Sequence, residues 1–254
     1  MTKSKLIESI LILLVFLIAF YGRKLLHAYI PIDLPQGMAR VAYVYAWWVI
    51  PVVLFVGLGY GLRNLGRELG LEGGFLAALL FAMITVSPMM IGSAFTGSIR
   101  NELDIWLVLN ASLFAGFFEE FLFRGFLFGL LFRRALWGFV PASLTGAVIF
   151  GLGHIYQGST LLESSGVFFI TAIGAVWFAW LYVEWNENLW VPVLMHVLMN
   201  LSWTLFDVSD NALGTLLPNV FRGITIALSI LITIRMKSRL SVNRQNLWFN
   251  TSVK

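Results

Sequence analysis

Residues 117–125 read Phe117-Phe118-Glu119-Glu120-Phe121-Leu122-Phe123-Arg124-Gly125, which places two carboxylates and one guanidinium in an otherwise apolar run. The run extends from Leu103 to Phe132, about 30 residues, and as a helix it is long enough to cross a bilayer. An ionisable group at that depth costs roughly 2.5–3.5 kcal/mol on insertion. Because ionisable groups inside a membrane usually have a function, we take this stretch as the candidate active centre.

The composition around this stretch is that of a membrane protein. Of the 254 residues, 59% are hydrophobic and only 12% are charged, against about 25% charged in soluble domains. We therefore expect an all-α, polytopic helical bundle forming one integral membrane domain over residues 1–254. The net charge of +4 lies mostly at the ends and loops of the spans, so it indicates topology and not nucleic-acid binding. The lack of cysteine excludes disulfides, thiolate metal sites and cysteine nucleophiles.

Apolar runs between charged or Gly/Pro breaks predict about eight transmembrane helices. The first resembles a signal-peptide core, but no small-x-small cleavage site follows it, which favours an uncleaved anchor. The third contains Pro88, which we expect to kink or break the helix. The expected segments are Leu6–Phe20, Met38–Leu62, Gly73–Phe95, Leu103–Phe132, Leu136–Gly153, Gly166–Glu184, Asn188–Phe206 and Thr215–Ile234.

Positive charge predicts the orientation of these segments. With the N-terminus inside, the inner segments hold eleven basic residues and the outer loops hold five, with Arg124 left in the membrane. This excess predicts that the N- and C-termini are both cytoplasmic, in agreement with an even number of spans. The inner residues are Lys3, Lys5, Arg63, Arg67, Arg133, Arg134, Arg235, Lys237, Arg239, Arg244 and Lys254, and the outer ones are Arg23, Lys24, Arg40, Arg100 and Arg222.

The spacing within the central stretch predicts different roles for its two carboxylates. Residues four apart share a helix face, whereas adjacent residues diverge by about 100°. Glu120 and Arg124 are therefore expected to pair, with the acid in the favourable N-terminal position. Glu119 points elsewhere and stays free. A free carboxylate in an apolar, partly wet cavity suits a general base, although an internal ion pair that only locks two helices is the structural alternative.

The chain has three histidines. His27 follows the first segment in a Lys/Leu-rich loop and is expected on the surface. Phe150 precedes His154 by four residues and Asn200 follows His196 by four, so each pair shares a helix face. A single membrane histidine more often makes a core hydrogen bond. Two of them with an aligned Asn and a free Glu, on different helices, favour a buried polar site assembled across the bundle.

Three motifs in these segments resemble the intramembrane CAAX-protease family, the type II prenyl endopeptidases with their bacterial bacteriocin-processing and immunity relatives. Each motif is weak alone, but all three occur in the family's order on separate predicted helices. The resemblance covers about residues 103–206, which we take as a CAAX-protease-like core. The motifs are Glu119-Glu120-x-x-x-Arg124, Phe150-x-x-x-His154 and His196-x-x-x-Asn200.

The resemblance implies peptide-bond hydrolysis in a cavity between the fourth, fifth and seventh helices. Glu119 would activate a water for attack on the scissile carbonyl, with assistance from His154. His196 and Asn200 would donate hydrogen bonds to the developing oxyanion. The implied substrate is a prenylated protein processed at its C-terminus or another membrane-associated peptide.

The resemblance gives Glu120, Arg124 and Phe150 supporting roles and leaves two kinds of chemistry open. In the first kind, the protein supplies three ligands to a zinc ion, and the fourth position stays open. In the second kind, a glutamate activates the water without any cofactor. We favour this second mechanism because the His-Glu-x-x-His motif is absent. The zinc ligands would be Glu119, His154 and His196.

One spacing conflicts with a shared site. A helix that starts inside at Leu136 places His154 about 27 Å along it, near the outer face, whereas His196 lies about 10 Å from the inner face. The two histidines can meet only if a boundary is displaced, and we expect the error in Arg133–Ser143, which contains Pro141.

Two other classes of function fit a buried polar cluster in a membrane bundle. One is a non-catalytic immunity or scaffold protein that keeps the cluster for stability. The other is a proton-coupled transporter in which Glu119 and the histidines relay protons.

Overall fold

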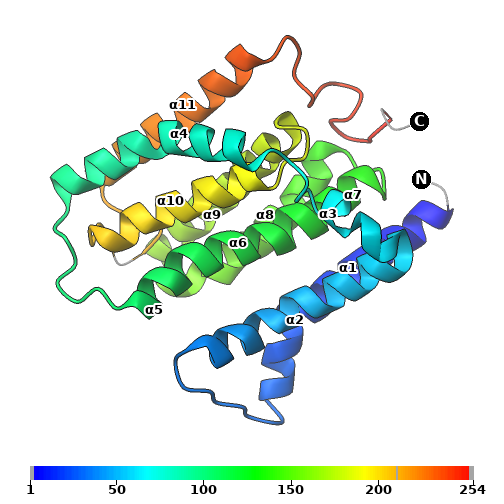
Figure 1. Ribbon diagram of the computed structural model, residues 1–254, viewed down its shortest axis with the longest axis horizontal. Coiled ribbons are helices and arrows are strands. Elements are labelled where there is room, and N and C mark those ends of the chain that lie inside the picture. The colour runs from blue at the N-terminus through cyan, green and yellow to red at the C-terminus, as the bar shows by residue number, and fades with distance from the viewer. Residues whose placement is uncertain (1–2, 210, 252–254) are drawn as a thin grey trace.

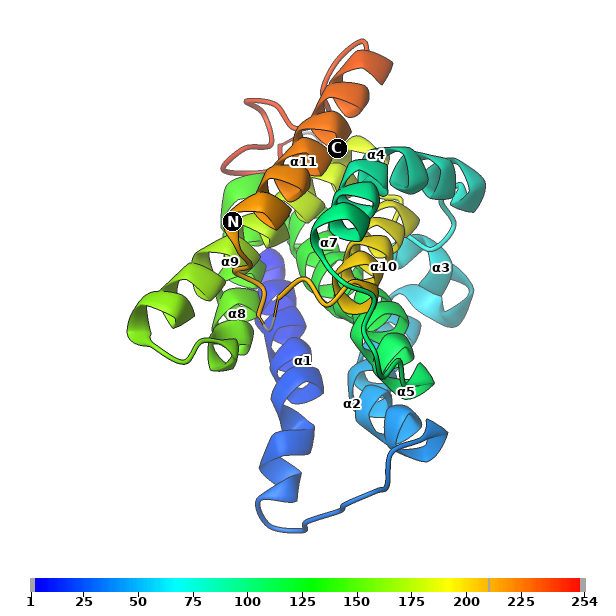
Figure 2. The same ribbon diagram turned by 90° about the vertical axis from the view of Figure 1, so that its left-hand side faces the viewer.

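A computed structural model describes residues 3–209 and 211–251, and its long helices lie side by side as a bundle (Figures 1 and 2). The α-helices are α1 (Lys3–His27), α2 (Met38–Val56), α3 (Leu65–Glu68), α4 (Phe75–Thr96), α5 (Ile105–Val108), α6 (Ala115–Glu120), α7 (Gly129–Arg133), α8 (Phe139–His154), α9 (Leu161–Glu184), α10 (Trp190–Leu205) and α11 (Leu216–Met236). Short π- or 3₁₀-helical pieces join several of them: η1 (Gly57–Gly61), η2 (Leu62–Asn64), η3 (Leu109–Phe114), η4 (Phe121–Phe128) and η5 (Ile155–Gln157).

Among the described residues, seven helical stretches are long and apolar enough to cross a membrane. An eighth, α10, has 16 residues, so its length of about 24 Å falls short of the hydrocarbon core of about 30 Å. The chain is thus a polytopic all-α membrane protein, as the sequence predicts. The seven stretches are Lys3–His27, Met38–Glu68, Phe75–Thr96, Ile105–Arg133, Phe139–Gln157, Leu161–Glu184 and Leu216–Met236.

Several predicted boundaries need correction. Helix α9 begins five residues before the predicted Gly166, and α4 runs through Pro88 without a break. Arg222, counted with the outer loops although the predicted segment Thr215–Ile234 contains it, lies inside α11. His27 is the last residue of α1 instead of a loop residue, and its side chain is 40% exposed, so its surface position is confirmed.

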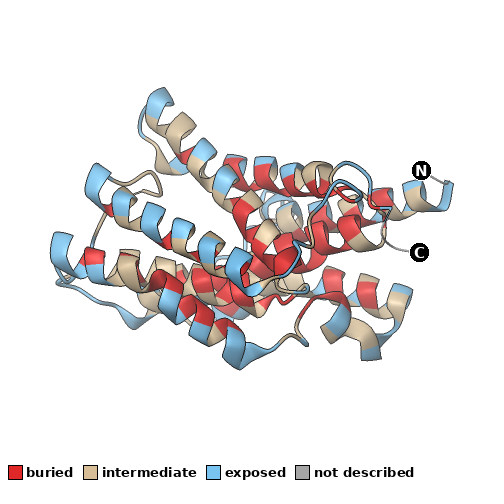
Figure 3. Cartoon of the chain, turned by 90° about the horizontal axis from the view of Figure 1, so that it is seen from above, coloured by how far each residue is buried: buried red, intermediate tan, exposed pale blue. Residues whose placement is uncertain are grey.

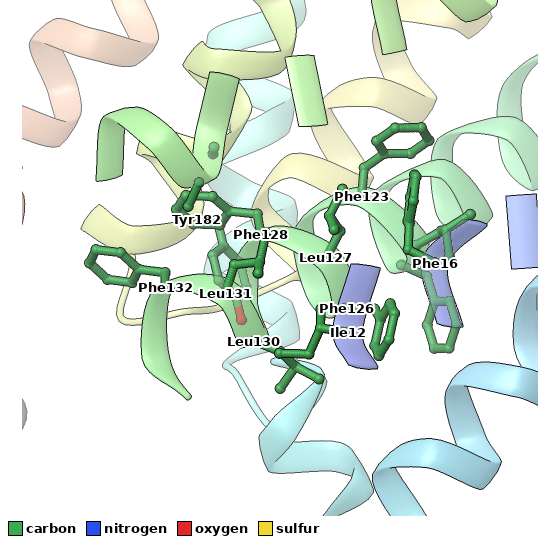
Figure 4. Packing of buried hydrophobic residues seen from close by; sticks show 14 of the residues in the cluster. Ile12, Phe16, Phe123, Phe126, Leu127, Phe128, Leu130, Leu131, Phe132 and Tyr182 are labelled. Carbon is green, nitrogen blue, oxygen red and sulfur yellow. The ribbon is translucent and has the colours of Figure 1, made fainter. Parts of the chain in front are cut away.

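The fourth span alternates between α- and π-helix. It runs α5, η3, α6, η4 and α7, so the glutamates sit on one short α-helical piece between two π-helical ones. All eight residues of η4 are buried, and its rings pack against α1, α8 and α9 in the main core (Figure 4). Buried residues gather in the middle of the bundle, whereas exposed ones lie toward its ends and outer faces (Figure 3). π-helical turns occur often at functional sites. This span is therefore the central element of the bundle.

Both ends of the described chain lie at one end of the bundle, which we call the termini end (Figure 1). Trp137 Nε1 donates to Ser9 Oγ at 2.9 Å, and Gly138 N donates to Trp248 O at 3.1 Å. Buried Glu184 accepts the backbone N–H of Ser241 at 2.9 Å. These contacts join the start of α1, the connection from α7 to α8, the end of α9 and the C-terminal segment.

An ion-pair network stabilises the termini end. Arg134 donates from two of its nitrogens to the buried carboxylate of Glu68, and this contact raises the pKa of the Arg134 guanidinium. Arg133 pairs with Glu187 at 3.1 Å, while burial raises the pKa of the Glu187 carboxyl. The connections after α3, α7 and α9 are thereby held against one another.

The depth conflict between the histidines has two causes. Helix α8 begins at Phe139 and not at the predicted Leu136, which moves His154 inward by about 4.5 Å. This boundary lies in the region where we expected an error, but it removes only part of the difference of about 17 Å.

The larger cause is the position of α10, which begins inside the bundle. Leu189 is fully buried, and its backbone N–H donates to Gly70 O at 2.8 Å. The ring of Trp190 already lies 6.0 Å from the ring of Phe117, only two residues before the first glutamate. The start of α10 therefore lies beside the second half of the fourth span, where a Cβ on Gly125 would be 3.2 Å from Leu189 Cδ2, and His196 lies beside Glu120.

Candidate active site

Glu120 connects the fourth span to α10. Its side chain is fully buried, and its Oε1 accepts both Arg124 Nη1 at 2.9 Å and His196 Nδ1 at 2.8 Å. The predicted pair at i and i+4 is therefore present. The Arg124 guanidinium also lies over the rings of Phe150, at 5.0 Å, and Phe178, at 5.5 Å. One ion pair thus contacts α8, α9 and α10 together.

Glu119 faces a cavity of about 660 Å³ instead of this ion pair. Its side chain is 19% exposed, and its Oε2 lies 3.9 Å from His196 Nε2, which is too far for a hydrogen bond. The structure thus has one carboxylate neutralised by Arg124 and one left in a cavity, the division that the helix spacing predicts.

His154 lines the same cavity from the last turn of α8. Its Nδ1 lies 2.7 Å from Phe150 O, and its ring packs on the Phe150 ring at 4.4 Å. Because a carbonyl oxygen can only accept, Nδ1 carries the proton. The Nε2 lone pair of neutral His154 is therefore available to a water or a substrate group in the cavity.

The hydrogen bond to Glu120 orients the ring of His196. A carboxylate acceptor at Nδ1 fixes the proton on that nitrogen, so Nε2 is an acceptor in the neutral ring and a donor only in the imidazolium. The oxyanion role implied by the family resemblance requires this charged form.

Asn200 is oriented by the π-helical turn before the glutamates. Its Nδ2 donates to Ala111 O at 2.8 Å. Ala115 N–H bonds to Asn110 O, five residues back, so the regular α-helical partner of Ala111 O is replaced by the Asn200 amide. Asn200 also lines the cavity, and the second hydrogen of its amide can donate there.

Gly116 allows α6 and α10 to approach closely enough for these contacts. A Cβ at this position would lie 2.6 Å from Val197 Cγ2 and 2.9 Å from the backbone nitrogen of Val197. Gly116 is one turn before Glu119 and Glu120, and Val197 follows His196. Sequence reasoning missed this glycine, although a glycine one turn before a charged pair in an apolar run is a visible signal.

The cavity is walled by more helices than the three predicted. The fourth, fifth and seventh segments contribute as expected, and Met89 of α4, Thr171 of α9 and Arg222 of α11 also line it. Its remaining walls come from the loops after α8 and α10, at the end of the bundle opposite the termini end (Figure 1). These loop residues are Tyr156, Gln157, Ser209, Asn211 and Ala212.

The proposed zinc ligands are not arranged as a metal site. Across residues 3–209 and 211–251, no three His, Asp or Glu side chains are grouped so as to hold a metal ion. His196 Nδ1 is occupied by Glu120 and His154 Nδ1 by a backbone carbonyl, which leaves one nitrogen of each ring. We therefore derive no chemical step through a metal.

Together these features define a class of protein: a membrane-embedded helical bundle with a free carboxylate and two histidines in one internal cavity. Residues 101–202 match the family described as Type II CAAX prenyl endopeptidase Rce1-like. This match confirms the predicted resemblance to that family over less than half of the chain. It contains all the predicted site residues and runs from just before α5 to near the end of α10. Comparisons with curated proteins and with solved structures gave no match.

Proposed function

We propose that the protein is an intramembrane endopeptidase in which Glu119 activates the attacking water. The observation that carries this proposal is the difference in environment between the two carboxylates. Glu120 is buried and paired with Arg124, whereas Glu119 remains unpaired by any guanidinium and faces the cavity with His154 and His196. A carboxylate kept from its neighbouring cation is suited to accept a proton.

In the proposed reaction, a water lies between Glu119 and the Nε2 lone pair of His154. Glu119 takes one proton from the water as its oxygen bonds to the scissile carbonyl carbon. Protonated His196 and the second N–H of Asn200 donate to the oxyanion that forms. The carbon–nitrogen bond then breaks, the leaving nitrogen takes the proton held by Glu119, and the products are a carboxylic acid, which keeps the second proton of the water, and an amine.

The position of the cavity favours one substrate class over the other. The loops after α8 and α10 form part of the cavity wall at the end opposite the termini end, and the charge distribution predicts that the termini are cytoplasmic. The loop-lined side of the cavity would then face away from the cytoplasm. We therefore favour a membrane-associated peptide that reaches the outer face over a prenylated protein of the cytoplasm.

This orientation is testable by cysteine labelling, because the native chain has no cysteine. We expect Ser98→Cys, exposed in the loop after α4, to react with a membrane-impermeant maleimide in intact cells. Ser238→Cys, exposed at the termini end, should react only after the membrane is permeabilised. The reverse pattern would place the loop-lined side of the cavity in the cytoplasm and restore the prenylated protein as the favoured substrate.

Peptide hydrolysis by purified protein in detergent tests the activity itself. We expect cleavage of fluorogenic hydrophobic peptides, offered with and without a farnesyl group, and we expect no cleavage by Glu119→Ala. Each reaction is run with and without a zinc chelator, because a cofactor-free mechanism predicts equal rates in both. Loss of activity with the chelator would instead support a metal at Glu119, His154 and His196.

The same assay separates the rival functions. Detergent micelles sustain no proton gradient, so cleavage there would rule out a role limited to proton-coupled transport. A scaffold or immunity protein would cleave none of the peptides although it is folded. Uncleaved peptides with a well-folded wild-type protein would thus contradict the proposed function.

A further inference from the structure

Tyr45 of α2 packs directly against the residue that precedes the proposed base. Its ring stacks on the ring of Phe118, with 4.0 Å between the ring centres and 15° between the planes. Tyr45 also makes an edge-to-face contact with Trp48, three residues later on α2, at 5.5 Å. Helix α2 lies outside the region matched by the family, so the match does not account for these contacts. They fix the Tyr45 ring next to the chain that carries Glu119.

The hydroxyl of Tyr45 is free to donate a hydrogen bond. It makes none within the described part of the chain, and it is accessible, whereas the hydroxyl of Tyr43 is sealed in the protein without a partner. Tyr45 lines a pocket of about 330 Å³ together with Asn110, which also lines the catalytic cavity. Glu119 is the charged side chain that acts electrostatically on the Tyr45 hydroxyl.

The Glu119 carboxylate lacks a hydrogen-bond donor. Among the described residues no N–H or O–H group donates to it, and His196 Nε2 stays 3.9 Å away. The proton of neutral His154 faces a backbone carbonyl, and the proposed reaction directs His196 and Asn200 to the oxyanion. Tyr45 has no such commitment, so its hydroxyl is left for Glu119.

We propose that Tyr45 is a positioning residue for the base, its hydroxyl donating to one carboxylate oxygen of Glu119 while the other oxygen takes the proton from water. This proposal rests on the proposed protease function and deepens it. A donor on one oxygen holds the carboxylate in one rotamer, and the ring stack on Phe118 holds the backbone before it. Catalytic groups need such support, because they act only within about 0.5 Å of the productive geometry.

A double-mutant cycle in thermal unfolding tests the contact without requiring turnover. Tyr45→Phe keeps the ring and removes the donor, and we expect it to lower the Tm in detergent by about 2–4 °C. In the Glu119→Ala background, which offers no acceptor, the same substitution should leave the Tm unchanged. A hydroxyl that only supports the packing of α2 would lower the Tm equally in both backgrounds.

Peptide cleavage measures what the contact contributes to the reaction. Tyr45→Phe should lower kcat by about tenfold to hundredfold, the range of one hydrogen bond to a charged group, and leave KM unchanged. The loss is expected in kcat because the hydroxyl acts on the base and not on the bound peptide.

Tyr43→Phe is the matched control for both measurements. It makes the same chemical change on the same helix, two residues earlier, at a hydroxyl that has no hydrogen-bond partner. We expect its Tm and its kcat to equal those of the wild-type protein.

Equal Tm changes for Tyr45→Phe in the two backgrounds would overturn the proposal, and so would a kcat within twofold of the wild-type value. The protease function would stand in either case, provided that the wild-type protein cleaves peptides and Glu119→Ala does not. Coupling in the Tm without cleavage by the wild-type protein would contradict the protease and, with it, a positioning role for Tyr45.

Discussion

Glu119→Gln is expected to lower kcat by about a thousandfold or more while the protein keeps its fold and its affinity for peptide. Glutamine has the size of glutamate but cannot take a proton from water, and general bases contribute about 10²–10⁴-fold to a rate. Glu119 makes no ion pair with Arg124, and its carboxylate lies 3.9 Å from His196 Nε2. The substitution therefore removes chemistry without breaking a buried contact.

The measurement is a pair of values for each protein, the peptide cleavage rate and the apparent Tm in detergent. Glu163→Gln is the matched control, because Glu163 is a glutamate in the first turn of α9 outside the cavity, and its variant should cleave at the wild-type rate. Glu119→Asp keeps the base but withdraws it by one methylene and should retain partial activity. Cleavage by Glu119→Gln within tenfold of the wild-type rate would remove Glu119 from the role of base.

The features of this site that the sequence predicts correctly are those set by local spacing. Hydropathy places a helix on each of the eight segments, because a span needs about 20 apolar residues wherever it packs. The pairing of Glu120 with Arg124, and the separation of Glu119 from it, follow from the angle between neighbouring residues on a helix. These features depend on residues within one or two turns.

The features that the sequence does not predict depend on distant parts of the chain. Helix α10 begins deep in the bundle because the backbone N–H of Leu189 donates to Gly70 O. The hydropathy of α10 does not predict this contact. The π-helical turn that directs Ala111 O toward Asn200 also cannot be read from spacing. Arg222 is counted with the outer basic residues although the segment Thr215–Ile234 contains it, and spacing alone does not predict that it lines the cavity from α11.

The second large effect concerns the stability of the protein and the buried ion pair between Glu120 and Arg124. Arg124→Met is expected to destabilise the protein by about 3–5 kcal/mol, because it leaves the Glu120 carboxylate buried without a compensating cation. One oxygen of that carboxylate, Oε2, already has no hydrogen-bond partner. For a domain of this size the loss corresponds to a Tm lower by about 10 °C, measurable by thermal unfolding in detergent.

The double variant Glu120→Gln/Arg124→Met should recover most of this loss. It removes both charges, and replacing a whole buried ion pair by neutral groups is often neutral for stability. The glutamine carbonyl still accepts His196 Nδ1–H, so the ring keeps its orientation. The glutamine side chain carries no negative charge to stabilise a protonated His196, which is the proposed oxyanion donor. The double variant should therefore be stable but have a lower kcat. A double variant as unstable as Arg124→Met would show that the guanidinium matters through its packing on Phe150 and Phe178 and not through its charge.

Arg100→Met is the control, because it removes an arginine from an ion pair that is not buried. Arg100 pairs with Asp207 at the partly exposed cavity end, where solvent screens the charges, so its loss should cost less than about 1 kcal/mol. If Arg124→Met proved as mild as Arg100→Met, Glu120 would not be carrying a charge in the folded protein. His196 would then face a neutral partner at Nδ1, and the imidazolium on which the proposed oxyanion role depends would lose its support.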